Sequence, residues 1–221
     1  MRRKIALCLL VTLLAGCEAI PSAPAPRKTV AARSTAILTA NPEAQACFAD
    51  LGTRQADFTP LPDQYYGAGC STVGSVRLAS LKSDRADLRL AGLGPMTCPL
   101  ADTLAGWARY GVDRAAQQIL GSRLVKIETM GTYSCRNIAG SPRRSAHATG
   151  NAIDISGFVL ADGRRITVSG NWTDKSPQVQ RFFTTIRQSA CKRFGTVLTP
   201  AYNAAHHDHL HLEMSGRNYC K

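Results

Sequence analysis

Eight cysteines constrain this chain more than any other feature of its 221 residues. Six of them are widely spaced: Cys47, Cys70, Cys98, Cys135, Cys191 and Cys220. The absence of any Cys-x-x-Cys pair argues against a thiolate metal site. Six cysteines in an oxidising compartment predict three disulfides, for which fifteen pairings are possible. Pairing in order along the chain gives the expectation Cys47–Cys70, Cys98–Cys135 and Cys191–Cys220.

The first seventeen residues supply that compartment. A basic start, Met1–Lys4, precedes an apolar run over 5–14, which is far shorter than the ~20 helical residues that span a bilayer. This pattern predicts a secretory signal over residues 1–16. Leu-Ala-Gly-Cys at 14–17 resembles the bacterial lipobox, whose cysteine becomes the first mature residue and carries the lipid. The alternative is ordinary signal-peptidase cleavage, with Cys17 incidental.

The expected protein is therefore an exported bacterial lipoprotein that faces the periplasm, with its membrane anchor at Cys17. Glu18 follows the cysteine, which by analogy with enterobacterial sorting permits outer-membrane anchoring. Cleavage would remove Cys8 and three basic residues, so the net charge would fall from +12 to +9. The six remaining cysteines would then be free to form disulfides.

Composition and patterning indicate one globular domain. Hydrophobic residues make up 44% of the chain and charged residues 19%, which excludes disorder, collagen and coiled coil. Residues 17–45 hold the lipidated cysteine and a linker rich in Pro, Ala and Ser. The domain is expected over residues 46–221.

Apolar periodicity predicts an α+β fold, with a central antiparallel sheet flanked by helices and stapled by disulfides. The expected helices are 99–120 and 177–194, and the expected strands are 123–130, 152–159, 164–168 and 209–214. Leu100, Leu104, Trp107 and Tyr110 fall at helical spacing, while Gly121 marks the end of that helix. Asp162-Gly163 predicts the turn of a hairpin.

Histidines mark the candidate chemistry. The chain has five, and four of them fall within six residues: His206, His207, His209 and His211. On a strand, His209 and His211 would share one face. The fifth, His147, lies seven residues before Asp154. Two histidines, an aspartate and a water would complete a four-coordinate zinc site. At least one of His206 and His207 is interpreted as a solvated loop residue.

Two motifs carry a resemblance to known families. Residues 145–154 fit S-x-H-x-x-G-x-A-x-D, which resembles the first metal motif of the zinc D-Ala-D-Ala peptidases, in the clan that also contains lysostaphin and hedgehog. Asp-His-Leu-His at 208–211 matches the second clan motif, His-x-His. The chain is also similar to the bacterial extensin-like C-terminal domain over residues 46–221. That similarity rests on Thr132–Arg136, Gly150–Asp154, Phe194–Leu198 and Tyr202–His211.

The resemblance implies a hedgehog/D-Ala-D-Ala metallopeptidase-like fold and a role for each motif residue. His147, Asp154 and His211 would bind one zinc ion, and His209 would be the catalytic histidine. Asp208 stands where the peptidases place a glutamate base, so it competes with His209 for that role. Strand alternation favours His209 over Asp208, because His209 shares the face of His211.

Substrate would be anchored by Ser145 and Arg136. The planar fork of arginine suits a carboxylate or a carbonyl oxygen. Arg143 and Arg144 compete with Arg136 for this role, and Ser145 has the alternative of capping a turn.

The function implied is a zinc-dependent peptidase that cuts peptidoglycan stem or cross-link peptides with a metal-activated water. The alternative is a metal-containing module that binds or supports the cell wall without turnover. Basic residues are mostly scattered and no aromatic stripe interleaves with them, which argues against nucleic acid. A monomer whose partners are peptidoglycan and the membrane is expected.

Overall fold

A computed structural model of the chain describes residues 42–221, so the predicted leader, the linker as far as residue 41 and Cys17 lie outside the described residues. The α-helices are α1 (Pro42–Thr53), α2 (Cys98–Gly106), α3 (Val168–Asn171) and α4 (Pro177–Cys191). Two π-helical segments, η1 (Trp107–Asp113) and η2 (Ala116–Leu120), and two 3-10 turns, η3 (Ala146–Thr149) and η4 (Ala204–His206), complete the helical set.

The strands of the first half are β1 (Asp57–Pro60), β2 (Tyr65–Gly67), β3 (Cys70–Ser71), β4 (Ser75–Lys82), β5 (Asp87–Ala91) and β6 (Met96–Thr97). Those of the second half are β7 (Leu124–Gly131), β8 (Ala152–Leu160), β9 (Arg165–Thr167), β10 (Thr196–Leu198), β11 (Leu210–Glu213) and β12 (Tyr219–Cys220). The predicted hairpin is confirmed, because β9 pairs with β8 antiparallel.

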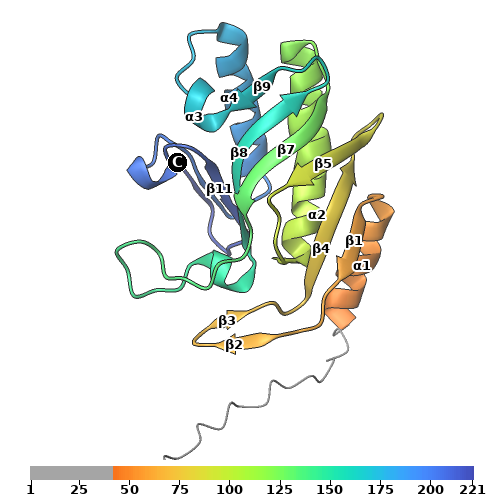
Figure 1. Ribbon diagram of the computed structural model, residues 1–221, viewed down its shortest axis with the longest axis vertical. Helices are drawn as coiled ribbons and strands as arrows, with labels where there is room; N and C mark the ends of the chain where they lie inside the picture. Colours follow the sequence, from red (N-terminus) through yellow and green to blue (C-terminus); the bar gives the residue numbers. More distant parts are fainter. Residues whose placement is uncertain (1–41) are drawn as a thin grey trace, which may run out of the picture. The chain divides into compact units, whose positions relative to one another are not determined.

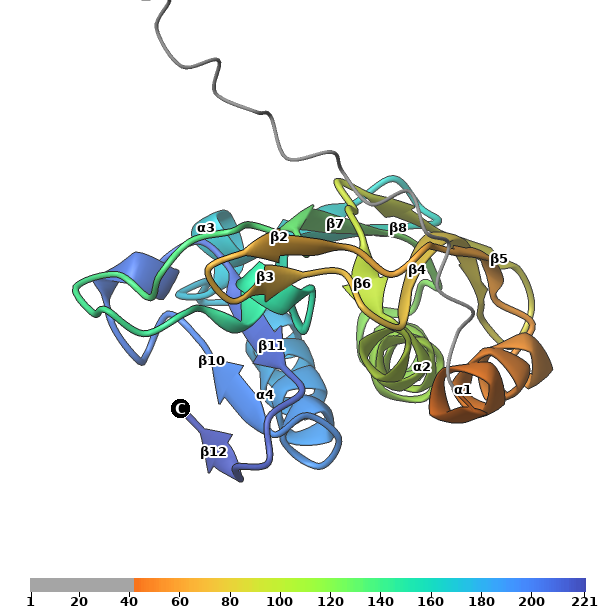
Figure 2. The same ribbon diagram turned by 90° about the horizontal axis from the view of Figure 1, so that it is seen from below.

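One mixed sheet organises the domain, in the order β1-β4-β5-β7-β8-β11-β10-β12 (Figure 1). Most neighbours are antiparallel, but β5–β7 and β10–β12 are parallel. Figure 2 shows α1, α2 and α4 together on one side of strands β4, β5, β7 and β8. The predicted class, a single α+β domain with a central sheet and flanking helices, is confirmed, and the sheet is antiparallel except at those two pairs. None of the helices in residues 42–221 combines the length and apolar character needed to cross a membrane.

The helix predicted over 99–120 is present as α2, η1 and η2, which follow one another along one helical run. Pro99 lies in its first turn, and Gly121 ends it in the left-handed conformation, with φ 72°. Tyr110 departs from the prediction, because its side chain is 42% exposed although its neighbours at helical spacing are buried. Arg109 and Arg114 lie over its ring, at 5.2 and 4.7 Å from the centroid.

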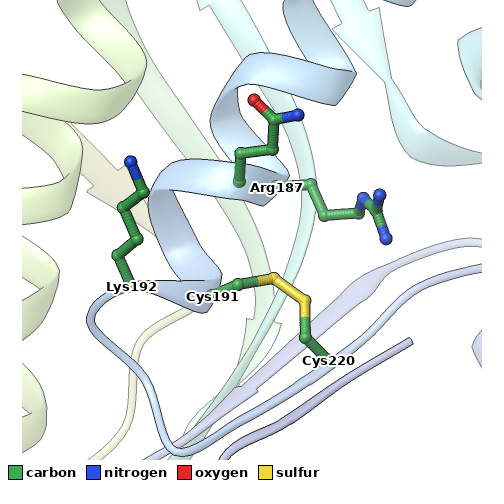
Figure 3. A pocket seen from close by; sticks show the side chains of 5 residues that line it. Arg187, Cys191, Lys192 and Cys220 are labelled. Atoms are coloured by element: carbon green, nitrogen blue, oxygen red, sulfur yellow. A yellow bond between two sulfur atoms is a disulfide. The ribbon is translucent and has the colours of Figure 1, made fainter.

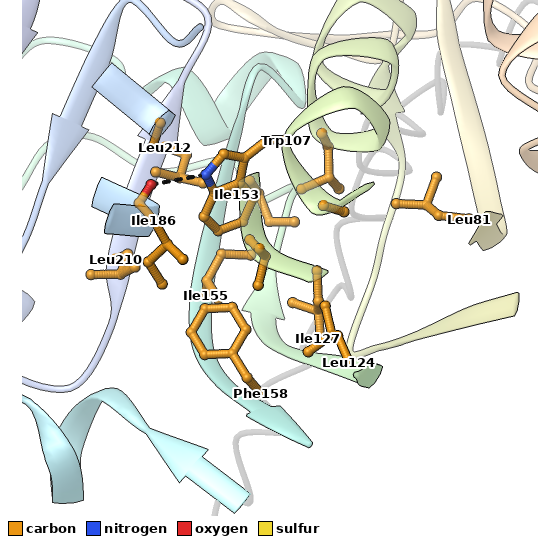
Figure 4. Packing of buried hydrophobic residues seen from close by; sticks show 14 of the residues in the cluster. Leu81, Trp107, Leu124, Ile127, Ile153, Ile155, Phe158, Ile186, Leu210 and Leu212 are labelled. Atoms are coloured by element: carbon orange, nitrogen blue, oxygen red, sulfur yellow. Dashed lines mark hydrogen bonds between the residues drawn. The ribbon is translucent and has the colours of Figure 1, made fainter. Parts of the chain in front are cut away.

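The core fills the space between the sheet and these helices (Figure 4). Trp107 is fully buried, and its indole N–H donates to the carbonyl of Ile186 at 3.0 Å, which ties α4 to the long helical run. From the sheet, Ile153 on β8 and Leu212 on β11 point into the same core. Because side chains alternate along a strand, the residues next to Ile153 on β8 and next to Leu212 on β11 face the opposite side of the sheet, away from the helices.

Three disulfides are present, as predicted, but two of the predicted pairings are wrong. The bonds are Cys47–Cys98, Cys70–Cys135 and Cys191–Cys220. Pairing in chain order assumes that neighbours in sequence are neighbours in space. Instead α1 packs on α2, which brings together the first pair, and the β2–β3 hairpin lies against the loop after β7.

Removing the Cys47–Cys98 bond with a double alanine variant is expected to lower the free energy of unfolding by about 4 kcal/mol. The bond closes 51 residues of chain, and a loop of that size loses much entropy when it is cross-linked. Denaturant titration measures the loss, and peptide mapping under non-reducing conditions tests the pairing. A peptide that links Cys47 to Cys70 would contradict this connectivity.

Asp84 predicts a pH dependence of stability. Its carboxylate accepts hydrogen bonds from Arg114 and Arg109, which lower the pKa of Asp84 to about 2. A carboxyl whose pKa is lowered by folding stabilises the protein above its ordinary pKa, and this contribution is lost as the pH falls through the folded value. Asp84→Asn should therefore melt at a lower temperature than the wild type at pH 6, with the gap closing near pH 2. A gap that is unchanged at pH 2 would show that the charge of Asp84 does not contribute.

Candidate metal centre

The centre is built on two neighbouring strands. In the register of the antiparallel pair β8–β11, Asp154 lies directly opposite His211, and both are buried. Their strand neighbours Ile153, Ile155 and Leu212 face the core. Asp154 and His211 therefore occupy the sheet face away from the helices.

The third member, His147, comes from the short turn η3. Ser145 caps this turn by accepting a hydrogen bond from the backbone N–H of His147. Gly150 ends it with φ 65°, and an added Cβ would lie 3.2 Å from the carbonyl oxygen of Pro95. The chain can reverse tightly there and enter β8 at Ala152, which places His147 and Asp154 at the two ends of one reversal.

Gly150→Ala is expected to destabilise the protein by about 1–3 kcal/mol, through a strained left-handed alanine and a close backbone contact. Metal binding should weaken too, because η3 positions His147. Gly121→Ala is the matched control: its φ is also positive, but nothing lies within 4 Å of an added Cβ. Thermal melting and metal titration of both variants measure the effects. Equal losses in the two variants would show that the contact of Gly150 with the Pro95 segment is unimportant.

Ligand atoms of the three residues converge. Nε2 of His147 lies 3.2 Å from Oδ2 of Asp154 and 3.3 Å from Nδ1 of His211, and Nδ1 of His211 lies 2.9 Å from Oδ1 of Asp154. Each residue offers one ligand atom, and the three atoms all lie within 4.8 Å of one another. Two imidazole nitrogens and a carboxylate are ligands that zinc and similar divalent cations accept. This donor set therefore fits a metal ion.

The outer nitrogen of each ligand histidine has an acceptor of its own. Nδ1 of His147 donates to the carbonyl of Thr132 at 3.2 Å, which leaves the lone pair on Nε2, the atom that faces the centre. Nε2 of His211 lies 3.3 Å from a carboxylate oxygen of Glu213. Such partners fix the tautomer and the ring orientation of metal-binding histidines. Neither Thr132 nor Glu213 was among the site residues predicted from the sequence.

Electrostatics supports the same interpretation. Burial alone would raise the pKa of Asp154, but the hydrogen bonds from His147 and His211 outweigh it and hold that pKa well below its ordinary value. Burial alone would lower the pKa of His211, yet Asp154 and Glu213 raise it to about 9. Without a metal, the centre thus holds a proton between anionic groups. A cation that takes this place displaces the proton.

His209 lies beside the three ligand residues. It precedes β11 directly, and its Nε2 is 3.6 Å from Oδ1 of Asp154. Its other nitrogen, Nδ1, donates to the carboxylate of Asp208 at 2.8 Å. That hydrogen bond holds the pKa of Asp208 below its ordinary value. The structure thus places Nε2 of His209 toward the centre and Asp208 behind the histidine.

His206 is a member of the site that sequence analysis left undecided. Its ring centroid lies 5.1 Å from that of His209 and 5.8 Å from that of His211. Burial, and then electrostatic interaction with the neighbouring imidazoles, lower the pKa of His206 to about 4, so His206 is neutral at pH 7. Asn203 accepts from its Nδ1 at 2.7 Å. His207, by contrast, is exposed, as expected for one of the two.

The structure gives different surroundings to the residues that were predicted to anchor substrate. Ser145 is buried and acts as the cap of η3, which matches the alternative raised for it. Arg136 is exposed, and its charge contributes to the low pKa of His206, so it lies near the site. Arg144 is engaged elsewhere, because it donates to the carbonyl of Ala68 and to the side chain of Asn137.

Two surface depressions lie elsewhere in the described part of the chain. One, of about 470 Å³, is lined by Arg187, Gln188, Cys191, Lys192 and Cys220, beside the last disulfide (Figure 3). The other, of about 260 Å³, lies along α4. Trp172 is among its lining residues, and its ring packs at 5.3 Å on that of Phe183. No ligand residue of the centre lines either depression.

One family of known proteins matches the domain. The profile of the extensin-like protein C-terminus matches residues 45–221. The chain belongs to this family. All the residues of the centre, from Thr132 to Glu213, fall within the matched range of the extensin-like domain. No curated protein and no solved structure matches the chain significantly.

Proposed function

We propose that this extensin-like domain is a zinc-dependent peptidase that hydrolyses amide bonds in the stem or cross-link peptides of peptidoglycan. The observation that carries the proposal is the convergence of His147, Asp154 and His211, with His209 directly beside them. Motif order on the chain adds support, because the two motifs resemble those of the zinc D-Ala-D-Ala peptidases.

When bound at this centre, a divalent cation would polarise an amide carbonyl and lower the pKa of a water molecule. The chain itself supplies the base. His209 donates from Nδ1 to Asp208, so its Nε2 carries the lone pair that can accept a proton from water. Asp208 would stabilise the imidazolium that results, and later Nε2 could return the proton to the leaving amine.

This arrangement favours His209 over Asp208 as the base. The carboxylate of Asp208 contacts the far nitrogen of His209, and the lowered pKa makes it a weak base at neutral pH. Arg136 and Arg143 are both exposed, and Arg136, whose charge contributes to the low pKa of His206, is the preferred candidate for holding a carboxylate of the substrate.

The proposed setting is the periplasm. An anchor at Cys17 and the linker to residue 45 would hold the domain at the membrane, within reach of the cell wall. The disulfides in residues 42–221 support this proposal, because structural disulfides persist in oxidising compartments.

The test is to incubate the full chain, in mild detergent and loaded with zinc, with intact peptidoglycan and to analyse the products by mass spectrometry. Release of peptides, or opening of cross-links, is expected, and a chelator should abolish it. A second candidate, a metal-containing wall-binding module, predicts binding to the wall with no new amine termini. No cleavage of any muropeptide by the zinc-loaded chain would overturn the peptidase proposal.

A further inference from the structure

Two adjacent tyrosines protrude from the small β2–β3 hairpin. Tyr65 is 72% exposed and Tyr66 is 53% exposed, although large aromatic side chains are usually covered. The ring of Tyr66 lies against that of Tyr133, with centroids 5.6 Å apart. Tyr66 and Tyr133 together form a small aromatic surface, called the tyrosine platform below.

One disulfide and several hydrogen bonds within the domain hold the tyrosine platform in place. The Cys70–Cys135 bond joins the hairpin to the loop that carries Tyr133. Arg144 donates to the carbonyl of Ala68 at the hairpin turn. The hydroxyl of Tyr66 is hydrogen-bonded to the side chain of Gln64. Rigid presentation lowers the entropy that a ligand must overcome on binding.

The platform adjoins the metal centre through the backbone. Tyr133 follows Thr132, whose carbonyl accepts from the ring of His147, and precedes Ser134, whose N–H donates to the carbonyl of His147 at 3.0 Å. The residues on either side of Tyr133 are therefore both hydrogen-bonded to His147. Figure 1 shows the hairpin and the loop of residues 132–146 at the same, lower end of the sheet.

We propose that the tyrosine platform binds a sugar ring of a β-linked N-acetylhexosamine glycan, which deepens the proposed function and rests on it. The C–H face of a pyranose is flat and positively polarised, and it suits the negative face of an aromatic ring. Exposed polar groups at 134–137, including Arg136, lie next to Tyr133 and can bond to hydroxyl and acetamido groups.

A protein partner fits this surface less well. Stable protein interfaces bury about 800 Å² on each side, and two tyrosine rings offer much less. One sugar unit matches the size of the pair.

The experiment measures binding of the full chain, in mild detergent with a chelator present, to glycan strands freed of all stem peptides. Co-sedimentation with the insoluble glycan and fluorescence titration with a soluble N-acetylglucosamine oligomer give two readouts. The dissociation constant for Tyr66→Ala should rise about ten-fold, the effect of one lost stacking contact. Tyr66→Phe keeps the ring and should bind within about two-fold of the wild type.

Tyr110→Ala is the matched control, because Tyr110 is a similarly exposed tyrosine on the helical run, away from the hairpin. Tyr110→Ala should bind as the wild type does. The melting curves of the two Tyr66 variants should coincide with that of the wild type, as expected if the hairpin remains folded. Equal binding of Tyr66→Ala and wild type, or no binding of the wild type to either glycan, would overturn the inference. Since the glycan contains no amide cross-link and the metal is removed, the outcome is independent of whether the chain is a peptidase.

Discussion

Replacing His211 with alanine is expected to weaken binding of zinc by at least about 100-fold, and to abolish hydrolysis with it. Loss of even a supporting partner of a metal ligand costs about 10–100-fold, and His211 would contribute a ligand atom itself, Nδ1, which faces Asp154 and His147. Titration against a chromogenic chelator measures the affinity. Zinc at about 100 times its dissociation constant should stabilise the wild type by about 2.7 kcal/mol but not the variant.

His207→Ala is the matched control for His211→Ala. His207 lies in the same segment, but its side chain is 73% exposed and contacts the carbonyl of Ala204 and the side chain of Asp208. The control variant should retain wild-type affinity for zinc. If His211→Ala keeps its zinc, or if both variants lose it equally, the assignment of the centre to His147, Asp154 and His211 is wrong.

Replacing His209 with alanine is expected to lower kcat by about 100- to 10,000-fold while leaving zinc bound. A positioned general base contributes an effect of this size, and His209 lies 3.6 Å from Asp154 without being one of the three convergent ligands. KM should change little, because the proposed role is proton transfer rather than binding. Steady-state hydrolysis of a purified cross-linked muropeptide, alongside metal content, measures both quantities.

Asp208→Asn separates the two candidate bases. If His209 is the base, this variant should keep part of the activity, because only the partner of Nδ1 is altered. Loss of nearly all activity in Asp208→Asn, with His209→Ala itself retaining most of its activity, would assign the base to Asp208 instead. Loss of zinc from His209→Ala would show that this histidine is a ligand.

The sequence predicted those helices and strands in which the periodicity of apolar residues agrees with the residues that mark the ends of the element. The long helix has Pro99 in its first turn and ends before Gly121 as expected, because both residues act on the backbone of their own turn. The strands β7, β8 and β11 also followed from alternation. Strands β1, β4 and β5 were not predicted, although β4 is as long as β7, has an alternating burial pattern and pairs with strands near it in sequence, β1 and β5.

Resemblance to the two family motifs identified the three candidate ligand residues but not their hydrogen-bond partners. His147 and Asp154 lie in one motif, and His211 lies in the second motif, so all three could be named before the structure. Thr132 and Glu213 carry no such signal, because a backbone carbonyl has no identity in the sequence and a glutamate on a strand end is common. His206 required the fold, since the ring contacts that include it in the site arise from the turn η4.

The sequence by itself determined the family, the fold class, the number of disulfides among residues 42–221 and the identity of the three convergent residues. The family and the three residues follow from the resemblance of two motifs to known families. The fold class and the number of disulfides follow from periodicity and composition, which can be read from short segments or counted over the whole chain. Only the tertiary structure decided which cysteines pair, which nitrogen of each histidine faces the centre, and that Tyr66 meets Tyr133. These depend on segments some 50 to 70 residues apart meeting in space, and that meeting is set by packing of the whole sheet against its helices.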